Sequence, residues 1–143
     1  MKTALKSPKD ENLWFDIADN EYATKTLHAL GDDIKREILT SFIDTPRTIN
    51  EVLRMHRISH TSGYRKAKSL IDDGLLVSTN ISQIERGKSV NTYIPIFKNI
   101  IIRIAENKVI IKVQFNKTER NMSLLLPLID KLAVANKIHL HKW

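Results

Sequence analysis

Residues 48–76 read TINEVLRMHRISHTSGYRKAKSLIDDGLL, and this stretch decides the fold. Thr48 and Glu51 have the spacing of a capping box, in which a threonine hydroxyl and a glutamate carboxylate satisfy the free N–H groups at a helix start. Apolar residues then follow at helical spacing. The pattern predicts a short helix that begins after Thr48 and ends near His56.

A second helix is predicted directly after this one, over about residues 59–73. Ser59 can cap its N-terminus, and the glycine that follows it can end it. On a helical wheel, one side carries only small and apolar residues, which are Gly63, Ala67, Leu70 and Gly74. The opposite side carries hydroxyl and basic residues, which are Thr61, Tyr64, Arg65 and Lys68. Two helices joined by a tight turn, the second with one basic side, are typical of a helix-turn-helix that reads the major groove of DNA.

Two further helices are predicted ahead of this motif. Asp32 or Asp33 can cap the nearer one, which carries apolar residues at helical spacing up to Phe42 and ends before a turn at 44–46. A weaker helical pattern runs over residues 13–30.

Strand patterns follow the second helix of the motif. Residues 75–84 and 89–96 flank a turn at 85–88, whose Gly87 can adopt a positive φ, so they predict a wing hairpin. A second hairpin with strictly alternating apolar residues is predicted around a turn at 106–108.

The last segment, from about Thr118 to Asn136, is helical in pattern, with a kink or break expected at Pro127. The elements together predict an α+β fold, a winged helix-turn-helix with an extra β-hairpin and N- and C-terminal helices. We divide the chain into an N-terminal arm or helix (1–22), a winged helix-turn-helix DNA-binding domain (23–96), an accessory β-hairpin (97–117) and a C-terminal helical segment for dimerisation (118–143).

The 143 residues carry a formal net charge of +7 and no cysteine. The missing cysteines exclude disulfides, zinc ribbons, iron–sulfur clusters and thiol nucleophiles. The first 21 residues hold three Lys against five Asp and Glu, so the positive charge belongs to the rest of the chain. A body this basic favours a polyanion as partner, with nucleic acid the first candidate. Because the chain has neither an apolar run of membrane-spanning length nor a signal-peptide core, we expect a cytoplasmic protein with no membrane contact.

Three stretches resemble the winged helix-turn-helix of prokaryotic, including archaeal, ArsR-like transcriptional regulators. They are ALGDDIKREIL (29–39), TINEVL (48–53) and ISHTSGYRKAKSLIDDGLL (58–76), and the resemblance covers about residues 27–96. The resemblance implies that the helix at 59–73 enters the major groove, while the wing at 85–88 rests on the DNA backbone or minor groove.

Carried over by position, the resemblance gives the DNA-binding candidates Ser59, His60, Thr61, Ser62, Tyr64, Arg65, Lys68, Arg86 and Lys88. Gly63 departs from the family, which usually has a larger apolar residue there. The smaller residue suggests a tighter approach to the preceding helix or a shifted reading helix.

Metal-binding and enzymatic functions find no support in the residues. ArsR-like proteins often sense metals through cysteine near the first helix of the motif, and this chain has none. His56 and His60 straddle a turn, and His139 and His141 have no nearby carboxylate, so we expect no metal site and no cofactor. Nucleotide-binding loops, nucleophile elbows and zinc-protease motifs are absent, and we expect no enzymatic activity.

Apolar residues in the terminal segments exceed what a winged helix needs for its core. In similar regulators the terminal helices pair across a two-fold axis, which spaces two reading helices about one DNA turn apart. A homodimer is therefore expected, although these helices can instead cover the second hairpin within one subunit. The interface candidates are Trp14, Leu124, Leu125, Leu128 and Leu132.

The sequence thus predicts a homodimeric transcriptional regulator that binds double-stranded DNA in a sequence-specific way. The alternative is a winged-helix protein-interaction adaptor of the transcription machinery that does not read DNA sequence. RNA binding is less favoured, because the aromatic residues follow apolar patterns and form no stacking platform.

Overall fold

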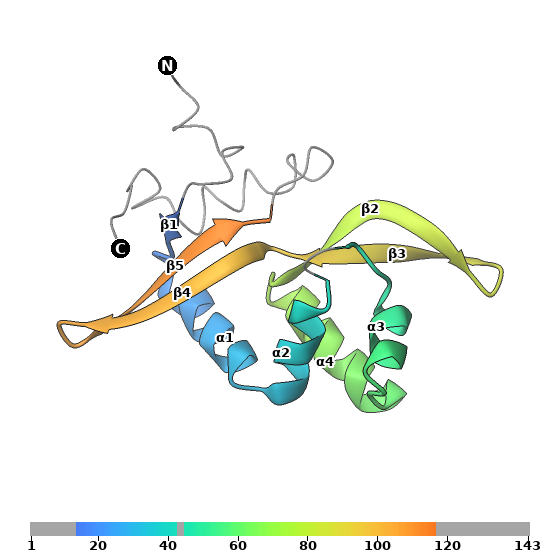
Figure 1. Cartoon of the computed structure of the whole chain (residues 1–143), viewed down its shortest axis with the longest axis horizontal. Coiled ribbons are helices and arrows are strands. Elements are labelled where there is room, and N and C mark those ends of the chain that lie inside the picture. The colour runs from blue at the N-terminus through green and yellow to red at the C-terminus, as the bar shows by residue number, and fades with distance from the viewer. Residues whose placement is uncertain (1–13, 43–44, 117–143) are drawn as a thin grey trace, which may run out of the picture. The chain divides into compact units, whose positions relative to one another are not determined.

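The computed structural model describes residues 14–42 and 45–116, which form an α+β fold (Figure 1). The helices are α1 (Asn20–Leu30), α2 (Asp33–Thr40), α3 (Ile49–Met55) and α4 (His60–Asp72). The strands are β1 (Phe15–Asp16), β2 (Leu76–Glu85), β3 (Lys88–Pro95), β4 (Phe97–Ala105) and β5 (Lys108–Phe115). The chain divides into two compact units, a helical unit (Lys25–Ile96) and a sheet unit (Met1–Thr24 with Phe97–Trp143).

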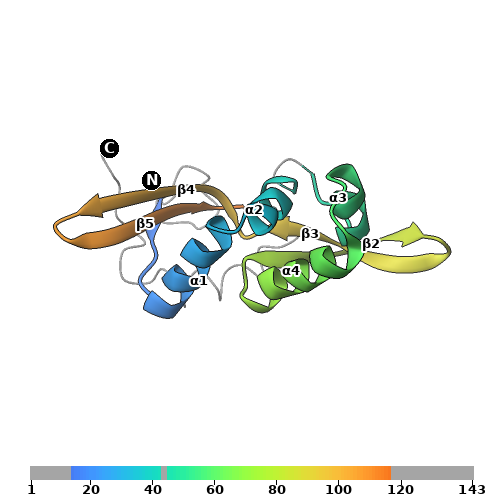
Figure 2. The same ribbon diagram turned by 90° about the horizontal axis from the view of Figure 1, so that it is seen from below.

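The helical unit is a helix-turn-helix with a wing. Helices α2, α3 and α4 lie on one side of the β2–β3 hairpin (Figure 1). The tip of the hairpin extends beyond α3 and α4 (Figure 2). The core between these elements is built from apolar side chains of each of them, including Ile38, Val52, Leu70, Leu76 and Ile94. Burial of one such side chain contributes about 1.5–3 kcal/mol, so this core fixes the three helices against the base of the wing.

The predicted bounds of α2, α3 and α4 are confirmed. The Asp32 carboxylate caps α2 by accepting two backbone N–H groups of its first turn, at 2.9 and 3.0 Å. The capping box between Thr48 and Glu51 is present in both directions at the start of α3. Helix α4 begins after Ser59, although the Ser59 side chain makes no capping hydrogen bond. Gly74, with φ +77°, follows the end of α4.

The helix predicted over residues 13–30 is wrong in its first half. Helix α1 begins later, because the Asp19 carboxylate accepts the backbone N–H of Tyr22 at 2.9 Å and caps the helix there. Upstream of this cap the chain is extended, and the ring of Phe15 packs edge-on against the ring of Phe115 with centroids 5.3 Å apart. The apolar residues before Asp19 therefore join a sheet, which is a long-range contact that local spacing does not reveal.

Both predicted hairpins are confirmed, and each closes through a two-residue turn in which both residues have positive φ. The turns are Arg86–Gly87 (φ +52° and +79°) and Glu106–Asn107 (φ +54° and +64°). Turns of this kind match the right-handed twist of antiparallel strands. In the sheet unit the strand order is β1–β5–β4, with antiparallel pairing throughout.

Several predicted features lie outside the described residues. They are residues 1–13 of the N-terminal arm, the C-terminal segment 118–143, and the interface candidates Leu124, Leu125, Leu128 and Leu132. Trp14, the remaining interface candidate, is half-buried. Among the helices of residues 14–42 and 45–116, none is long and apolar enough to span a membrane.

Gly63 sets how closely α3 and α4 approach each other. A Cβ atom at this position would stand 2.6 Å from a methyl carbon of Leu53 and 2.9 Å from a methyl carbon of Ile58. Leu53 is itself buried in the core, so its side chain has little room to move away. Of the two interpretations of the small residue, the structure therefore supports the tighter approach of the two helices.

We expect Gly63→Ala to lower the free energy of unfolding by about 1–2 kcal/mol. Overpacking a filled core costs about 1–3 kcal/mol, which exceeds the gain of about 1 kcal/mol in helix propensity. Gly31→Ala is the control, because a Cβ there meets only the Leu27 carbonyl oxygen at 3.4 Å and the His28 carbonyl oxygen at 3.6 Å. Urea denaturation of both variants measures the difference, and equal stability of Gly63→Ala and the parent would contradict it.

Candidate nucleic-acid interface

One face of α4 presents hydroxyl and basic side chains to solvent. Thr61, Arg65 and Lys68 are exposed, and the opposite side of the helix is buried through Gly63, Ala67 and Leu70. The Lys68 ammonium pairs with the Asp72 carboxylate at 3.1 Å, and both side chains are more than half exposed. An exposed pair of this kind is weak, so Lys68 can exchange its partner for a phosphate. The Arg65 guanidinium has no ion-pair partner within the described ranges.

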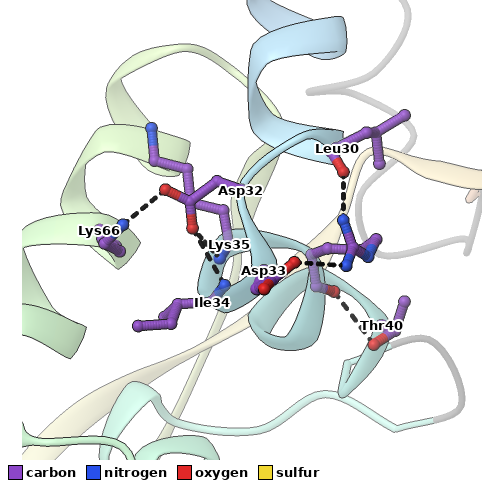
Figure 3. A network of polar contacts seen from close by, with 8 residues as sticks. Leu30, Asp32, Asp33, Ile34, Lys35, Thr40 and Lys66 are labelled. Carbon is purple, nitrogen blue, oxygen red and sulfur yellow. Dashed lines mark hydrogen bonds and ion pairs between the residues drawn. The ribbon is translucent and has the colours of Figure 1, made fainter.

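Helix α4 is held in place by polar contacts with α2 (Figure 3). The Lys66 ammonium on α4 pairs with the Asp32 carboxylate at 2.5 Å, and both side chains are about three-quarters buried. The Lys35 ammonium on α2 donates to the Ser69 hydroxyl on α4 at 2.9 Å. Since Asp32 also caps α2, one carboxylate fixes both the start of α2 and its contact with α4. The exposed face of α4 thereby keeps a fixed direction.

Tyr64 lies beside the exposed face of α4 instead of on it. Its hydroxyl donates to the side-chain oxygen of Asn50 on α3 at 2.6 Å. Its ring lies against the ring of His60, with centroids 4.4 Å apart. The sequence proposed Tyr64 for contacts with DNA, but in the structure its hydroxyl is engaged within the fold.

Glu85, the last residue of β2, joins the wing to α3. One carboxylate oxygen accepts the Thr48 hydroxyl at 2.5 Å, and the other accepts the Asn50 side-chain amide at 3.0 Å. A second contact between the wing and α3 is the Gln83 side-chain amide, which donates to the Glu51 carboxylate at 3.0 Å.

Protonation states follow from this arrangement. The hydrogen bonds from Thr48 and from Asn50 lower the pKa of Glu85, and the charges of Arg54 and Arg86 add to the effect. Burial, and then the charge of Glu85, raise the pKa of Tyr64. An ionised Glu85 accepts and a neutral Tyr64 donates, so both groups have the charge state that these hydrogen bonds require.

A groove of about 920 Å³ lies between the wing and the helix-turn-helix. Its walls come from α3, the turn before α4, the start of α4 and both strands of the wing. The cationic and imidazole side chains that line it are Arg54, Arg57, His60, Arg86 and Lys88. Its two carboxylates, Glu51 and Glu85, already accept hydrogen bonds from the fold. The groove therefore offers free positive charge to an anion.

Among the remaining candidates, Ser59, His60, Arg86 and Lys88 are exposed, and Ser62 is half-buried. Arg54, Arg57, Asn50 and Glu85 were missed by the sequence analysis. The two arginines had a signal in the sequence, because residues 54–71 contain five Lys and Arg and no carboxylate. Asn50 and Glu85 had none, since their roles depend on contacts across 35 positions of the chain.

In the described part of the chain, no group of three or more His, Asp or Glu residues is placed to hold a metal ion. The His56 ring contacts the Glu37 carboxylate at 3.3 Å and the Ser41 hydroxyl. His56 thus connects the end of α3 to α2.

No protein-family model and no curated protein matches the chain. Among solved structures, HlyU from Vibrio cholerae is similar at 14% identity and a TM-score of 0.41, with 80% of this chain and 94% of that chain covered. A second is the homodimeric winged helix-turn-helix DNA-binding domain (fragment 1–100) of Mb0332 from Mycobacterium bovis, described as a possible ArsR-family transcriptional regulator. It is 13% identical with a TM-score of 0.40, and the match covers 85% of this chain and 89% of that chain. The function is therefore argued below from this chain's own residues.

We expect the contact between Asp32 and Lys66 to make stability depend on acidic pH. The hydrogen bond from Lys66, followed by those from the backbone, lowers the pKa of Asp32 below its ordinary value of 3.8. A lowered pKa in the folded state stabilises the fold above the unfolded value, and this contribution disappears as the pH falls through the folded value. Asp32→Asn keeps an N-cap acceptor but removes the charge, so it should lose less stability than the parent on acidification.

Urea denaturation at about pH 6 and about pH 3 measures this difference. Asp33→Asn is the matched control, because its carboxylate is almost fully exposed and pairs only with Arg36 along α2. The control should lose as much stability as the parent. An equal loss in the parent and in Asp32→Asn would mean that this ion pair contributes nothing to the acid dependence.

Proposed function

We propose that this chain is a sequence-specific double-stranded DNA-binding transcriptional regulator, with α4 in the major groove and the wing tip at 85–88 on the DNA backbone. The observation that carries the proposal is a set of exposed cations on α4, on α3 and its following turn, and on the wing. None of them has an ion-pair partner within the described ranges, and they are Arg54, Arg57, Arg65, Arg86 and Lys88.

The two parts of this surface suit different contacts with DNA. Arg65 extends from the middle of a rigid helix, where its planar guanidinium can donate two hydrogen bonds to one guanine. Arg86 and Lys88 belong to the two-residue turn of a hairpin and the residue after it, where a phosphate is the better partner. Helix α4 would supply the sequence preference, and the wing would supply affinity that does not depend on sequence.

The alternative, a protein-interaction adaptor, has one observation in its favour. Met55 and Ile84 are large apolar side chains of the helical unit that are 52% and 70% exposed. Such side chains can anchor a protein interface. An adaptor that docks through them would tolerate the loss of Arg65 and would bind duplex DNA weakly with no preferred site.

We expect Arg65→Ala to weaken binding to a preferred duplex by about 1–3 kcal/mol, with a much smaller effect on a scrambled duplex. Arg86→Ala with Lys88→Ala should weaken both alike, and the slope of log affinity against log salt should fall by about 0.9 for each phosphate that the variant leaves unneutralised. The preferred duplex is first selected from a random library. Fluorescence titrations of both variants on both duplexes, at several salt concentrations, then measure the effects.

A parent chain that selects no preferred duplex would contradict the proposed function and favour the adaptor. Equal losses of affinity on both duplexes for Arg65→Ala would show that α4 does not read bases through this residue, and Lys68 would then be the next candidate.

We also propose that the regulator is a homodimer. Support comes from the sheet unit, where Ile102, Ile104 and Val109 are 44%, 81% and 53% exposed near the β4–β5 turn. Ile104 pairs with Val109, and Ile102 lies two residues before Ile104, so the three share one face of the hairpin. An apolar face of this size favours a protein partner. The leucine-rich segment 118–136 supplies further apolar residues that a two-fold interface can use.

We expect Leu125→Glu with Leu132→Glu to yield a folded monomer, because two buried charges at a dimer interface disfavour association. Light scattering gives the mass, and circular dichroism shows whether the variant is folded. Ser123→Glu with Asn136→Glu places the same charges at polar positions of the same segment and should remain dimeric. A monomeric parent would overturn the proposal, as would a double leucine variant that unfolds without dissociating.

A further inference from the structure

The carboxylate of Glu85 joins the wing to α3 directly and to α4 through Asn50. It accepts the Thr48 hydroxyl and the Asn50 amide, and the Asn50 side-chain oxygen in turn accepts the Tyr64 hydroxyl. We propose that Glu85 is a positioning residue, which sets the place of the wing tip relative to α4 and thereby the selectivity for DNA sequence. This inference rests on the proposed function.

A carboxylate at this place opposes the binding of a polyanion. Glu85 lines the cationic groove together with Arg54, Arg86 and Lys88. A negative charge among these cations would repel a DNA phosphate and lower the affinity. Both carboxylate oxygens point to α3, where they already accept hydrogen bonds. The contacts of Glu85 therefore indicate a role in holding the wing.

The wing needs such a contact because its pairing is interrupted halfway along. The ladder between β2 and β3 shifts register between Ser78 and Ser82, so that three residues of β2 face Thr92 alone on β3. Asn80, in the middle of this bulge, has φ +63°. A bulge of this kind breaks the ladder and bends the strand. The hairpin thus consists of an inner half near the core and an outer half that carries the tip.

The two halves are fastened by different contacts. Backbone hydrogen bonds between Arg47 and Tyr93, at 2.8 and 3.4 Å, hold the inner half. The outer half contacts α3 through Glu85 and through the bond from Gln83 to Glu51. Glu85 directly precedes the turn, so its contact acts at the part of the wing that would meet DNA.

Asn50 extends the contact to α4. Its amide nitrogen donates to Glu85 and its oxygen accepts from Tyr64, so a single side chain relates the wing tip to the reading helix. A carboxylate has no proton to give when ionised, which fixes the orientation of the amide group. Loss of either Glu85 or Asn50 should let the outer half of the wing move relative to Arg65.

The test uses variants that separate the charge of Glu85 from its position. Glu85→Gln removes the negative charge and weakens the two hydrogen bonds. We expect its affinity for a scrambled duplex to rise by about twofold to fivefold, as a repulsion is removed. Its selectivity, the ratio of preferred to scrambled affinity, should fall by about fivefold or more, as hydrogen bonds to a charged group are strong. Asn50→Ala keeps the charge, so it should lose selectivity without the gain in scrambled affinity.

Asp72→Asn is the matched control, since it removes an exposed carboxylate from α4 that contacts Lys68 and not the wing. It should raise affinity for both duplexes alike and leave selectivity unchanged. A second readout uses the free protein. Amide hydrogen exchange at residues 82–90 should become faster in Glu85→Gln and Asn50→Ala, while residues 76–78 of the inner half should keep the rate of the parent.

Unchanged exchange at residues 82–90 in both variants would overturn the proposed contact, whatever the DNA titrations show. Faster exchange with unchanged selectivity would overturn the positioning role. If the parent prefers no duplex, the proposed function fails, and hydrogen exchange in the free protein still decides whether Glu85 holds the wing.

Discussion

The close contact between Gly63 and Leu53 is the constraint on which the rest of the candidate interface depends. With no side chain at this point of α4, its backbone lies directly against the Leu53 methyl groups of α3. The ion pair between Lys66 and Asp32 holds α4 from the α2 side. A helix fixed on two sides has a defined outward face, so the direction of Arg65 is a consequence of packing. Recognition of a base edge needs such a fixed direction, because hydrogen bonds are sensitive to angle.

Local signals predicted the helical unit well. Capping residues such as Asp32 and Thr48, and turn glycines such as Gly87, act through their immediate neighbours, so their effect is readable from spacing. The start of α1 was mispredicted for the opposite reason. Phe15 belongs to a strand because Val113 lies opposite it, and these residues are far apart in the sequence. A short apolar run fits a helix or a strand equally well until its partner is known.

The candidate site shows the same division between local and long-range information. The wheel of α4 separated buried from exposed residues correctly, since that separation follows from helix geometry alone. The wheel placed Tyr64 with Arg65, yet the Tyr64 hydroxyl bonds to Asn50 on another helix. Likewise, Glu85 is one of four residues of a polar turn in the sequence, and its contact with Thr48 arises only when the wing folds over α3. Periodicity identifies the face on which a residue lies, but the partners on that face come from the tertiary fold.

The cations of the helical unit fall into two groups that net charge does not distinguish. One group is paired within the fold, through Lys25 with Asp73, Arg36 with Asp33 and Lys66 with Asp32. Two of these three pairs involve α2, away from the groove beside the wing. The other group surrounds that groove and the outer face of α4, where the carboxylates Glu51 and Glu85 are occupied by hydrogen bonds from the fold. Acidic residues thus neutralise the cations that hold the helices together and leave the others free. The positive field is concentrated where a polyanion would approach, which a chain with the same charge but evenly spread pairs would not achieve.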